Sequence, residues 1–273
     1  ITGPNADNHS IIGDWVLAQP KENIRTIVEG LRMVDRGSFN IDFLDVGGSV
    51  RNIDPALIKN VAKRARSADV AIVAVGGNPL RYDRRGKTSG ENVARSSIGL
   101  IGEQLELVKA IHATGVPTVV ILVNGRPIAE PWLVDNVHAI IEAWEPGALG
   151  GIALAEILFG RINPSGKLPI TVPYSVGHLR AIYNHKPTER VRRYVDAPNE
   201  NLFEFGHGLS YATFEYSNAE LSRPVIEIGE NTSLSVTVTN TGEVAGQEVV
   251  QLYIRDHFSE VTRPVKELKG FKR

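Results

Sequence analysis

The sequence lacks cysteine entirely across its 273 residues. That absence excludes disulfides, thiolate metal sites and a cysteine nucleophile, and it leaves the cellular compartment undecided. The seven histidines are scattered, and no two have the i, i+4 spacing of a helical zinc pair. No apolar run reaches the roughly 18 residues that a membrane-spanning helix needs. We therefore expect no metal, no organic cofactor and no membrane insertion.

The sequence also lacks an excess of charge of either sign. Thirty basic residues face thirty-one acidic ones, which gives a formal charge of −1. Proteins that grip a nucleic-acid backbone usually carry a basic excess or a basic stripe. The two short basic clusters are interpreted as solvated loops, and nucleic acid is not an expected partner; they comprise Arg81, Arg84 and Arg85, and Arg190, Arg192 and Arg193.

Three common motifs of α/β proteins are missing as well. There is no G-x-G-x-x-G and no G-x-x-x-x-G-K-[ST], and Pro79 stands where a phosphate-binding helix would have to open. A G-x-S-x-G elbow is also absent, which argues against a serine hydrolase. Nucleotide binding and Ser/His/Asp chemistry are thus set aside.

The first 175 residues nevertheless alternate buried strands with helices. Three apolar runs, at 70–75, 116–123 and 138–143, are typical of strands covered on both faces of a parallel sheet. Asp54-Pro55 predicts the start of a helix, and apolar residues at helical spacing over 101–111 predict another that stops near Gly115. The alternation predicts a layered α/β sandwich with a mostly parallel sheet.

The pattern changes after residue 175. Residues 176–210 show little periodicity and are interpreted as a linker, whereas 232–240 and 249–254 alternate or run like strands. Residues 211–273 are therefore predicted to be a partial β-sandwich, truncated because such sandwiches need about seven strands. The first eight residues read like the end of a strand and a turn rather than a signal peptide. We expect the chain to begin inside a larger protein.

The longest polar, glycine-rich stretch runs from 76 to 100, directly after the first buried strand. Ligands of open α/β sheets bind at the carboxyl ends of the strands, and long loops there often belong to active sites. Glu91 lies near the end of this stretch, with Arg95 four residues on. Composition alone favours a solvated loop with a weak surface ion pair.

Several motifs, in order and over the whole chain, resemble family 3 glycoside hydrolases of the β-glucosidase type. They are S-G-E-N-V-A-R-S-S-I at 89–98, N-G-R-P at 124–127, E-A-W-E-P-G at 142–147, L-F-G at 158–160, N-P-S-G-K-L-P at 163–169 and F-G-H-G-L-S-Y at 205–211. The last of these leads, in the family, into a fibronectin-III-like domain. The resemblance implies an α/β sandwich and the start of that domain, without the N-terminal barrel.

The resemblance also implies a reaction. The chain would belong to a retaining, exo-acting β-glycosidase that removes terminal β-D-glucosyl residues from a β-linked oligosaccharide or an aryl or alkyl β-glucoside. Glu91 would be the general acid/base, and the barrel would supply a nucleophilic aspartate, so that the fragment alone is expected to be inactive. Arg95 is expected to brace the loop instead of pairing with Glu91.

Trp15, Asp83 and Arg84 are the further candidates for substrate binding. Trp15 lies in Gly13-Asp14-Trp15, which is similar to a family segment whose tryptophan forms an aromatic wall at the leaving-group subsite. A core tryptophan is the alternative. Asp83 and Arg84 share the loop of Glu91.

Other readings stay open at this point. A β-xylosidase or mixed exo-glycosidase of the same family fits the motifs equally, and a non-catalytic carbohydrate-binding or scaffold module fits the fold. The presence of Glu91 argues against the N-acetylglucosaminidase branch. The resemblance suggests a periplasmic or secreted protein. The sugar, the linkage and the oligomeric state, a homodimer included, stay undecided.

Overall fold

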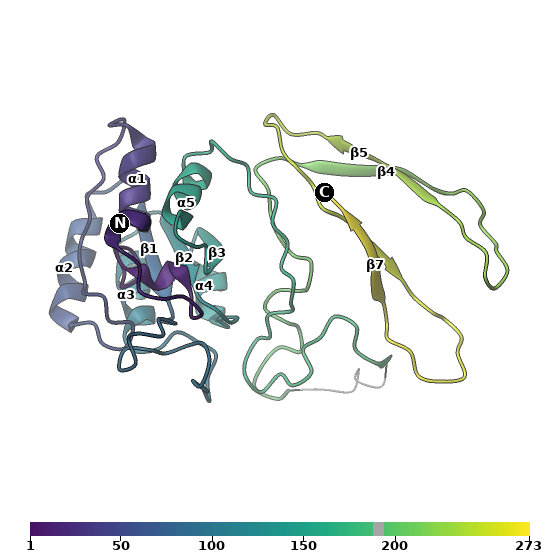
Figure 1. The fold of residues 1–273 in the computed structure, drawn as a ribbon, viewed down its shortest axis with the longest axis horizontal. Helices are drawn as coiled ribbons and strands as arrows, with labels where there is room; N and C mark the ends of the chain where they lie inside the picture. Colours follow the sequence, from purple (N-terminus) through teal and green to yellow (C-terminus); the bar gives the residue numbers. More distant parts are fainter. Residues whose placement is uncertain (188–193) are drawn as a thin grey trace.

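The computed structural model describes residues 1–187 and 194–273, and Figure 1 shows an α/β part followed by a β part. The Arg190, Arg192 and Arg193 cluster lies outside the described residues. The helices of the α/β part are α1 (Ile27–Asp35), α2 (Pro55–Ala65), α3 (Gln104–His112), α4 (Pro131–Asn136) and α5 (Gly150–Leu158), with short 3-10 turns η1 (His9–Ile12) and η2 (Lys21–Asn23).

The central sheet is parallel and has the order β1-β2-β3, formed by Ala71–Gly76, Thr118–Val123 and Ala139–Trp144. Thr2 continues the sheet beyond β1 through isolated parallel bridges to Val73 and Leu44. Thr2 is thus extended beside β1, and a turn follows it. Each of the three predicted apolar runs became a strand, which confirms the parallel α/β sheet.

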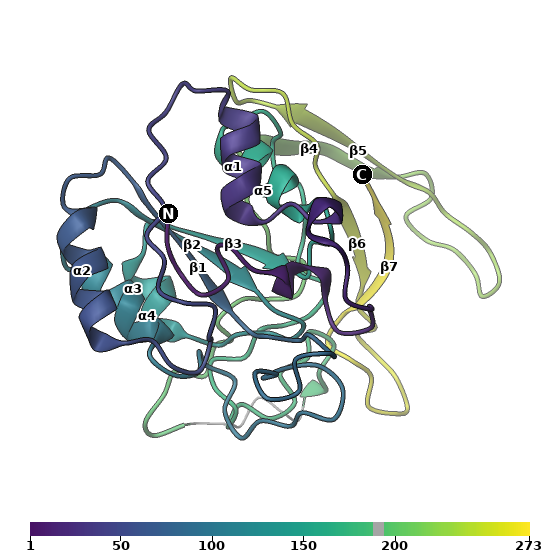
Figure 2. The same ribbon diagram turned by 60° about the vertical axis from the view of Figure 1, so that its left-hand side comes forward.

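Two apolar layers cover the sheet because successive strand residues point to opposite faces. Val73 and Val75 of β1 face one core, which α2, α3 and α4 cover. Ala74 of the same strand faces the second core, beneath α1 and α5. Figure 2 shows α1 and α5 on one side of the strands and α2, α3 and α4 on the other.

The helix ends follow their local sequence. Asp54 Oδ1 accepts a hydrogen bond from the Ala56 amide at 2.8 Å, and Pro55 is the first residue of α2, as predicted. Gly115, three residues after the end of α3, has φ +82. Helices α1 and α5 pack closely because Gly30 lies against the backbone of Gly151, where neither position has room for a side chain.

The β part consists of two antiparallel hairpins. β4 (Phe214–Leu221) pairs with β5 (Leu234–Asn240), and β6 (Val250–Ile254) pairs with β7 (Glu267–Lys272). The predicted strands at 232–240 and 249–254 correspond to β5 and β6. These small antiparallel sheets confirm the expected all-β character of this part.

Among its described residues, the segment 176–210 holds no α-helix and no β-strand. An isolated bridge from Val172 to Phe203 connects it to the chain before it, and Leu168 exchanges backbone hydrogen bonds with Gly206 and His207 at 2.8 and 2.7 Å. The boundaries 1–175, 176–210 and 211–273 remain our proposal for the domain organisation. Asn163 joins the two parts, since its side chain accepts from the Tyr211 amide at 2.8 Å and donates to Ala245 O at 2.9 Å.

Candidate active site

The carboxyl edge of the sheet gathers the segments that carried the sequence motifs. The loop after β1, residue Asn124 after β2 and Glu145 after β3 all leave the sheet at this edge. The segment that follows Thr2 leaves there too, because Thr2 runs parallel to β1. Segments distant in sequence therefore meet where open α/β sheets bind their ligands.

The loop after β1 is internally cross-linked although it has no regular structure. The Asn78 amide donates to Thr88 Oγ1 at 2.9 Å, and Asn78 O accepts from the Thr88 amide at 2.8 Å. Asp83 uses one carboxylate oxygen to accept from Asn78 Nδ2 at 2.6 Å and the other to accept from the Gly86 amide at 3.0 Å. The side chain of Asp83 thus closes a turn within the loop.

A buried ion pair holds the end of the loop that carries Glu91. Lys87 Nζ lies 2.7 Å from Asp14 Oδ1, and the two side chains are 9% and 8% exposed. The second oxygen of Asp14 accepts from the Glu91 amide at 2.6 Å. Gly90 has φ +89, and a Cβ there would lie 2.6 Å from Asp14 Oδ2, so the approach requires glycine.

Asp14 is an ionised anchor in this arrangement. Burial by itself would raise the pKa of its carboxyl. The hydrogen bonds from Lys87 and the Glu91 amide, together with the charges of Lys87 and Arg81, outweigh burial and lower the pKa below its usual value. Asp14 is therefore a carboxylate at neutral pH.

The carboxylate of Glu91 faces outward and is 43% exposed. Arg81 Nη2 lies 2.6 Å from Glu91 Oε2, and the Arg81 guanidinium stacks over the Trp15 ring at 3.8 Å from its centroid. Trp15 is 77% exposed and is therefore no core residue. Arg81 thus links Glu91 to Trp15. The expectation that Arg81 belongs to a freely solvated basic cluster was therefore wrong.

Three other arginines brace the same loop by binding backbone carbonyls. Arg95 Nη2 donates to Gly99 O at 2.6 Å, so it does not pair with Glu91, as expected. Arg126 Nη2 donates to Val93 O at 2.8 Å, and Arg51 Nη2 donates to Lys87 O at 2.8 Å.

Glu145 brings a further carboxyl group to this edge. It is partly buried, with its carboxyl oxygens against Gly13 and Gly125, and none of the described residues forms a hydrogen bond with it. Burial raises the pKa of Glu145, and the nearby charge of Asp14 raises it further, while Lys87 works in the opposite sense. Glu145 thus places a second carboxyl group close to that of Asp14.

The structure thus brings Glu91 and Trp15 together, and it places Asp83 inside the loop and Arg84 on its exposed surface. Their roles in catalysis and substrate binding stay predictions. Sequence reasoning missed Asp14 and Lys87 as partners of Glu91. The only signal for Asp14 is its position directly before Trp15.

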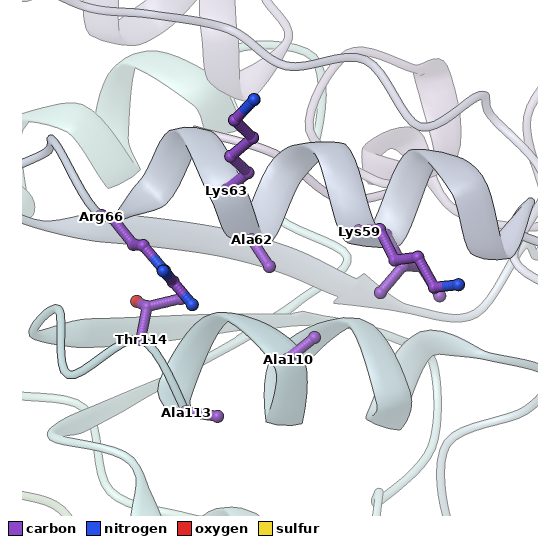
Figure 3. Close-up of a pocket in the computed structure, with 8 residues that line it drawn as sticks. Lys59, Ala62, Lys63, Arg66, Ala110, Ala113 and Thr114 are labelled. Atoms are coloured by element: carbon purple, nitrogen blue, oxygen red, sulfur yellow. The ribbon is translucent and has the colours of Figure 1, made fainter.

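A groove between α2 and α3 lies elsewhere on the molecule, as Figure 3 shows, and is lined by Ile58, Lys59, Ala62, Lys63, Arg66, Ala110, Ala113 and Thr114. None of these residues belongs to the loop of Glu91, so the groove is not part of the candidate site. Within 1–187 and 194–273, no cluster of His, Asp and Glu has the arrangement of a metal site. None of the helices in those ranges is both long enough and apolar enough to cross a membrane.

Comparison with known proteins gives these features a family. Residues 1–211 match the glycosyl hydrolase family 3 C-terminal domain, and residues 248–273 match a fibronectin type III-like domain. A periplasmic beta-glucosidase of Salmonella typhimurium is 35% identical over the whole chain. A beta-xylosidase of Formosa agariphila is 41% identical over 77% of the chain.

Solved structures agree with the sequence comparison. A mutant beta-glucosidase of Listeria innocua in complex with laminaribiose aligns over 99% of the chain with a TM-score of 0.87 and 31% identity. The chain spans 39% of the Salmonella protein, 28% of the Formosa protein and 37% of the Listeria chain. This chain belongs to glycosyl hydrolase family 3, in which it corresponds to the C-terminal domain together with fibronectin type III-like residues.

Proposed function

We propose that this chain is the C-terminal part of a retaining, exo-acting β-glycosidase that hydrolyses terminal β-D-glucosyl residues. The observation that carries the proposal is the placement of Glu91 at the carboxyl edge of the sheet, with an exposed carboxylate and a fixed backbone beside the exposed ring of Trp15. The beta-glucosidases among its relatives support glucose as the sugar.

The proposed mechanism divides the two carboxyl groups between two domains. Retaining glycosidases place a nucleophile and an acid/base about 5–5.5 Å apart across the anomeric carbon. We assign the acid/base to Glu91 and the nucleophile to an aspartate of an N-terminal barrel in the same protein. The chain alone is then inactive, since it lacks the group that forms the glycosyl-enzyme bond.

Glu91 acts twice in this scheme. Its proton passes to the glycosidic oxygen as the nucleophile attacks the anomeric carbon and the aglycone leaves. The resulting carboxylate then takes a proton from the water that attacks the glycosyl-enzyme, which releases the β-sugar and the aspartate. Arg81 pairs with Oε2 of Glu91, so that oxygen cannot donate a proton while the pair is closed, and either Oε1 carries the proton or the pair opens.

Trp15 provides the proposed wall for the leaving group. Sugar C–H groups stack on aromatic faces, and the ring of Trp15 is open to solvent apart from the Arg81 guanidinium on one face. A sugar on that face has to displace Arg81, whereas the opposite face stays available. Asp83 and Arg84 are proposed only as outer contacts, Asp83 because its oxygens are already engaged within the loop.

Substrates and location follow the relatives. We propose a β-linked oligosaccharide or an aryl or alkyl β-glucoside as substrate and a periplasmic or secreted protein, the latter in line with the Salmonella relative. A β-xylosidase is the second candidate, because the Formosa relative has a 41% identical sequence over its aligned part.

Hydrolysis of two aryl β-glucosides, one with a good and one with a poor leaving group, tests the role of Glu91 in the full-length protein. Glu91→Ala should lose about 10²–10⁴-fold in kcat/KM on the poor leaving group, retain much more on the good one, and regain turnover with azide. Glu106→Ala is the matched control, since Glu106 is also an exposed, ion-paired carboxylate.

Each outcome separates the candidates. Equal activity of Glu91→Ala and wild type on both glucosides would leave the loop as scaffold. Wild-type activity that is higher on the matching aryl β-xylosides would favour the β-xylosidase. No activity of the wild-type protein on either sugar series would favour the non-catalytic module.

A further inference from the structure

The backbone amide and the backbone carbonyl of Glu91 both form hydrogen bonds with one buried ion pair, Asp14 and Lys87. The Glu91 amide donates to Asp14 Oδ2 at 2.6 Å, and Lys87 Nζ donates to Glu91 O at 3.0 Å. Lys87 Nζ also lies 2.7 Å from Asp14 Oδ1. The three residues form a closed triangle in which each contacts the other two.

This arrangement differs from an ordinary surface salt bridge. Exposed ion pairs contribute little because water screens them, but Lys87 and Asp14 are 9% and 8% exposed. A buried charge that loses its partner is left without solvation, so the pair strongly favours one arrangement of the segments that it joins. Those segments are the turn that ends at Trp15 and the loop that ends at Glu91.

The pair therefore sets the distance between Trp15 and Glu91. Asp14 precedes Trp15 directly in the chain, while Lys87 lies four residues before Glu91. Arg81 adds a weaker link, since its Nε lies 3.5 Å from Asp14 Oδ1 while its guanidinium contacts both Trp15 and Glu91. The missing side chain of Gly90 is what allows the loop to reach the Asp14 carboxylate.

We infer that Asp14, through its ion pair with Lys87, is a positioning residue that holds the Glu91 carboxyl at the glycosidic oxygen and in register with Trp15. The inference rests on the proposed function of Glu91. Asp14 itself takes no part in proton transfer. Its loss should misplace the acid, which matters most for leaving groups that cannot depart without a proton.

Leaving-group dependence in the full-length protein provides the test. With a series of aryl β-glucosides, Asp14→Asn should lose about 100-fold in kcat/KM on the poorest leaving group, as expected for a misplaced catalytic group, and less than about fivefold on the best. In Asp14→Asn, kcat/KM should therefore depend more steeply on the leaving group than in wild type. The change should have the same direction as in Glu91→Ala and a smaller size. Asp42→Asn is the matched control, because Asp42 forms an exposed ion pair with Arg64 on a different segment.

The Lys87 side provides a second route if Asp14→Asn does not fold, as judged by circular dichroism. Lys87→Met should show the same steeper dependence of kcat/KM on the leaving group. Lys87→Arg, which keeps the charge, should retain most of the wild-type kcat/KM on poor leaving groups. A purely structural role predicts equal losses on all leaving groups, or none, and either result would overturn the inference.

The two proposals fail separately in this design. If Glu91→Ala shows no leaving-group dependence beyond that of wild type, the acid/base role itself is wrong. If Glu91→Ala shows it and the Asp14 and Lys87 variants do not, only the positioning role is wrong.

Discussion

Lys167 Nζ lies 3.4 Å from Glu248 Oε1, and this ion pair joins the end of the α/β part to the β part. The two side chains are 18% and 15% exposed, so water screens the pair only partly. Lys167 Nζ also donates to Gly208 O at 2.7 Å, and the Tyr216 hydroxyl donates to Glu248 Oε1 at 3.0 Å. The N-P-S-G-K-L-P motif thus has a structural role at the junction.

We predict that Lys167→Met and Glu248→Gln each lower the free energy of unfolding by about 1–3 kcal/mol, a value between those of exposed and buried pairs. Urea unfolding of this chain measures the loss, and the β part should unfold at lower urea than the α/β part. The double variant should lose less than the sum of the single losses, because the two residues contact each other.

Lys109→Met and Glu106→Gln are the controls, since these residues form an exposed pair on α3. Each should change stability by less than about 0.5 kcal/mol. Strict additivity at Lys167 and Glu248 would show that their contact does not couple the two parts.

Glu142 links pH to stability. Burial within β3 raises the pKa of Glu142 from 4.5 to about 8, although the Trp144 amide donates to its carboxyl at 3.0 Å and lowers the pKa somewhat. The folded chain therefore holds a proton on Glu142 that the unfolded chain has released. The stability associated with this proton is complete below pH 4.5 and is lost as the pH rises towards 8.

We therefore predict that the unfolding free energy of this chain falls between pH 5 and 8, by at most about 1.4 kcal/mol per pH unit from this group. Glu142→Gln should flatten that slope, because the amide does not titrate, and it should be more stable than wild type at pH 8. Urea unfolding at several pH values provides the measurement. An unchanged slope in Glu142→Gln would assign the pH dependence to other groups.

Glu142 lies next to a buried side-chain amide that has an unpaired atom. Asn124 Oδ1 has no hydrogen-bond partner, whereas Asn124 Nδ2 lies 3.4 Å from Glu142 Oε2. If the amide is rotated by half a turn, Asn124 Oδ1 can accept the Glu142 proton at the same place.

The regular elements of the α/β part could largely be predicted from the sequence. Uninterrupted β-branched runs have few alternatives to buried strands, and Asp54-Pro55 has a local reason to begin α2. Helices α1 and α5 were not identified individually, although their contact depends on Gly30 and Gly151, because nothing in either sequence indicates which partner lies opposite.

The candidate site was predictable only in part, for a physical reason. Glu91 and Trp15 could be found because they lie in motifs that resemble a family. The contact between Asp14 and Lys87 spans 73 residues and depends on how two loops leave the same sheet edge. No periodicity or local propensity encodes such a contact. For the same reason, a prediction from composition placed Arg81 in a solvated loop, whereas its guanidinium stacks on Trp15.

We predict that Trp15 contributes to binding of the leaving group and contributes little to the stability of the fold. Its ring is 77% exposed, so Trp15→Ala should change the stability of this chain by less than about 1 kcal/mol. In the full-length protein we expect Trp15→Ala to lower kcat/KM for laminaribiose about tenfold, equivalent to about 1.4 kcal/mol. β-Glucosyl fluoride, whose leaving group is too small to stack, should be affected less than threefold by the same argument.

Two variants complete this test. Trp15→Phe should keep most of the laminaribiose activity, since it retains an aromatic face. Leu17→Ala, an exposed apolar residue on the same segment, should leave both substrates unaffected. Equal losses on laminaribiose and β-glucosyl fluoride in Trp15→Ala would mean that Trp15 acts through Arg81 and the position of Glu91, and that the leaving-group wall lies elsewhere.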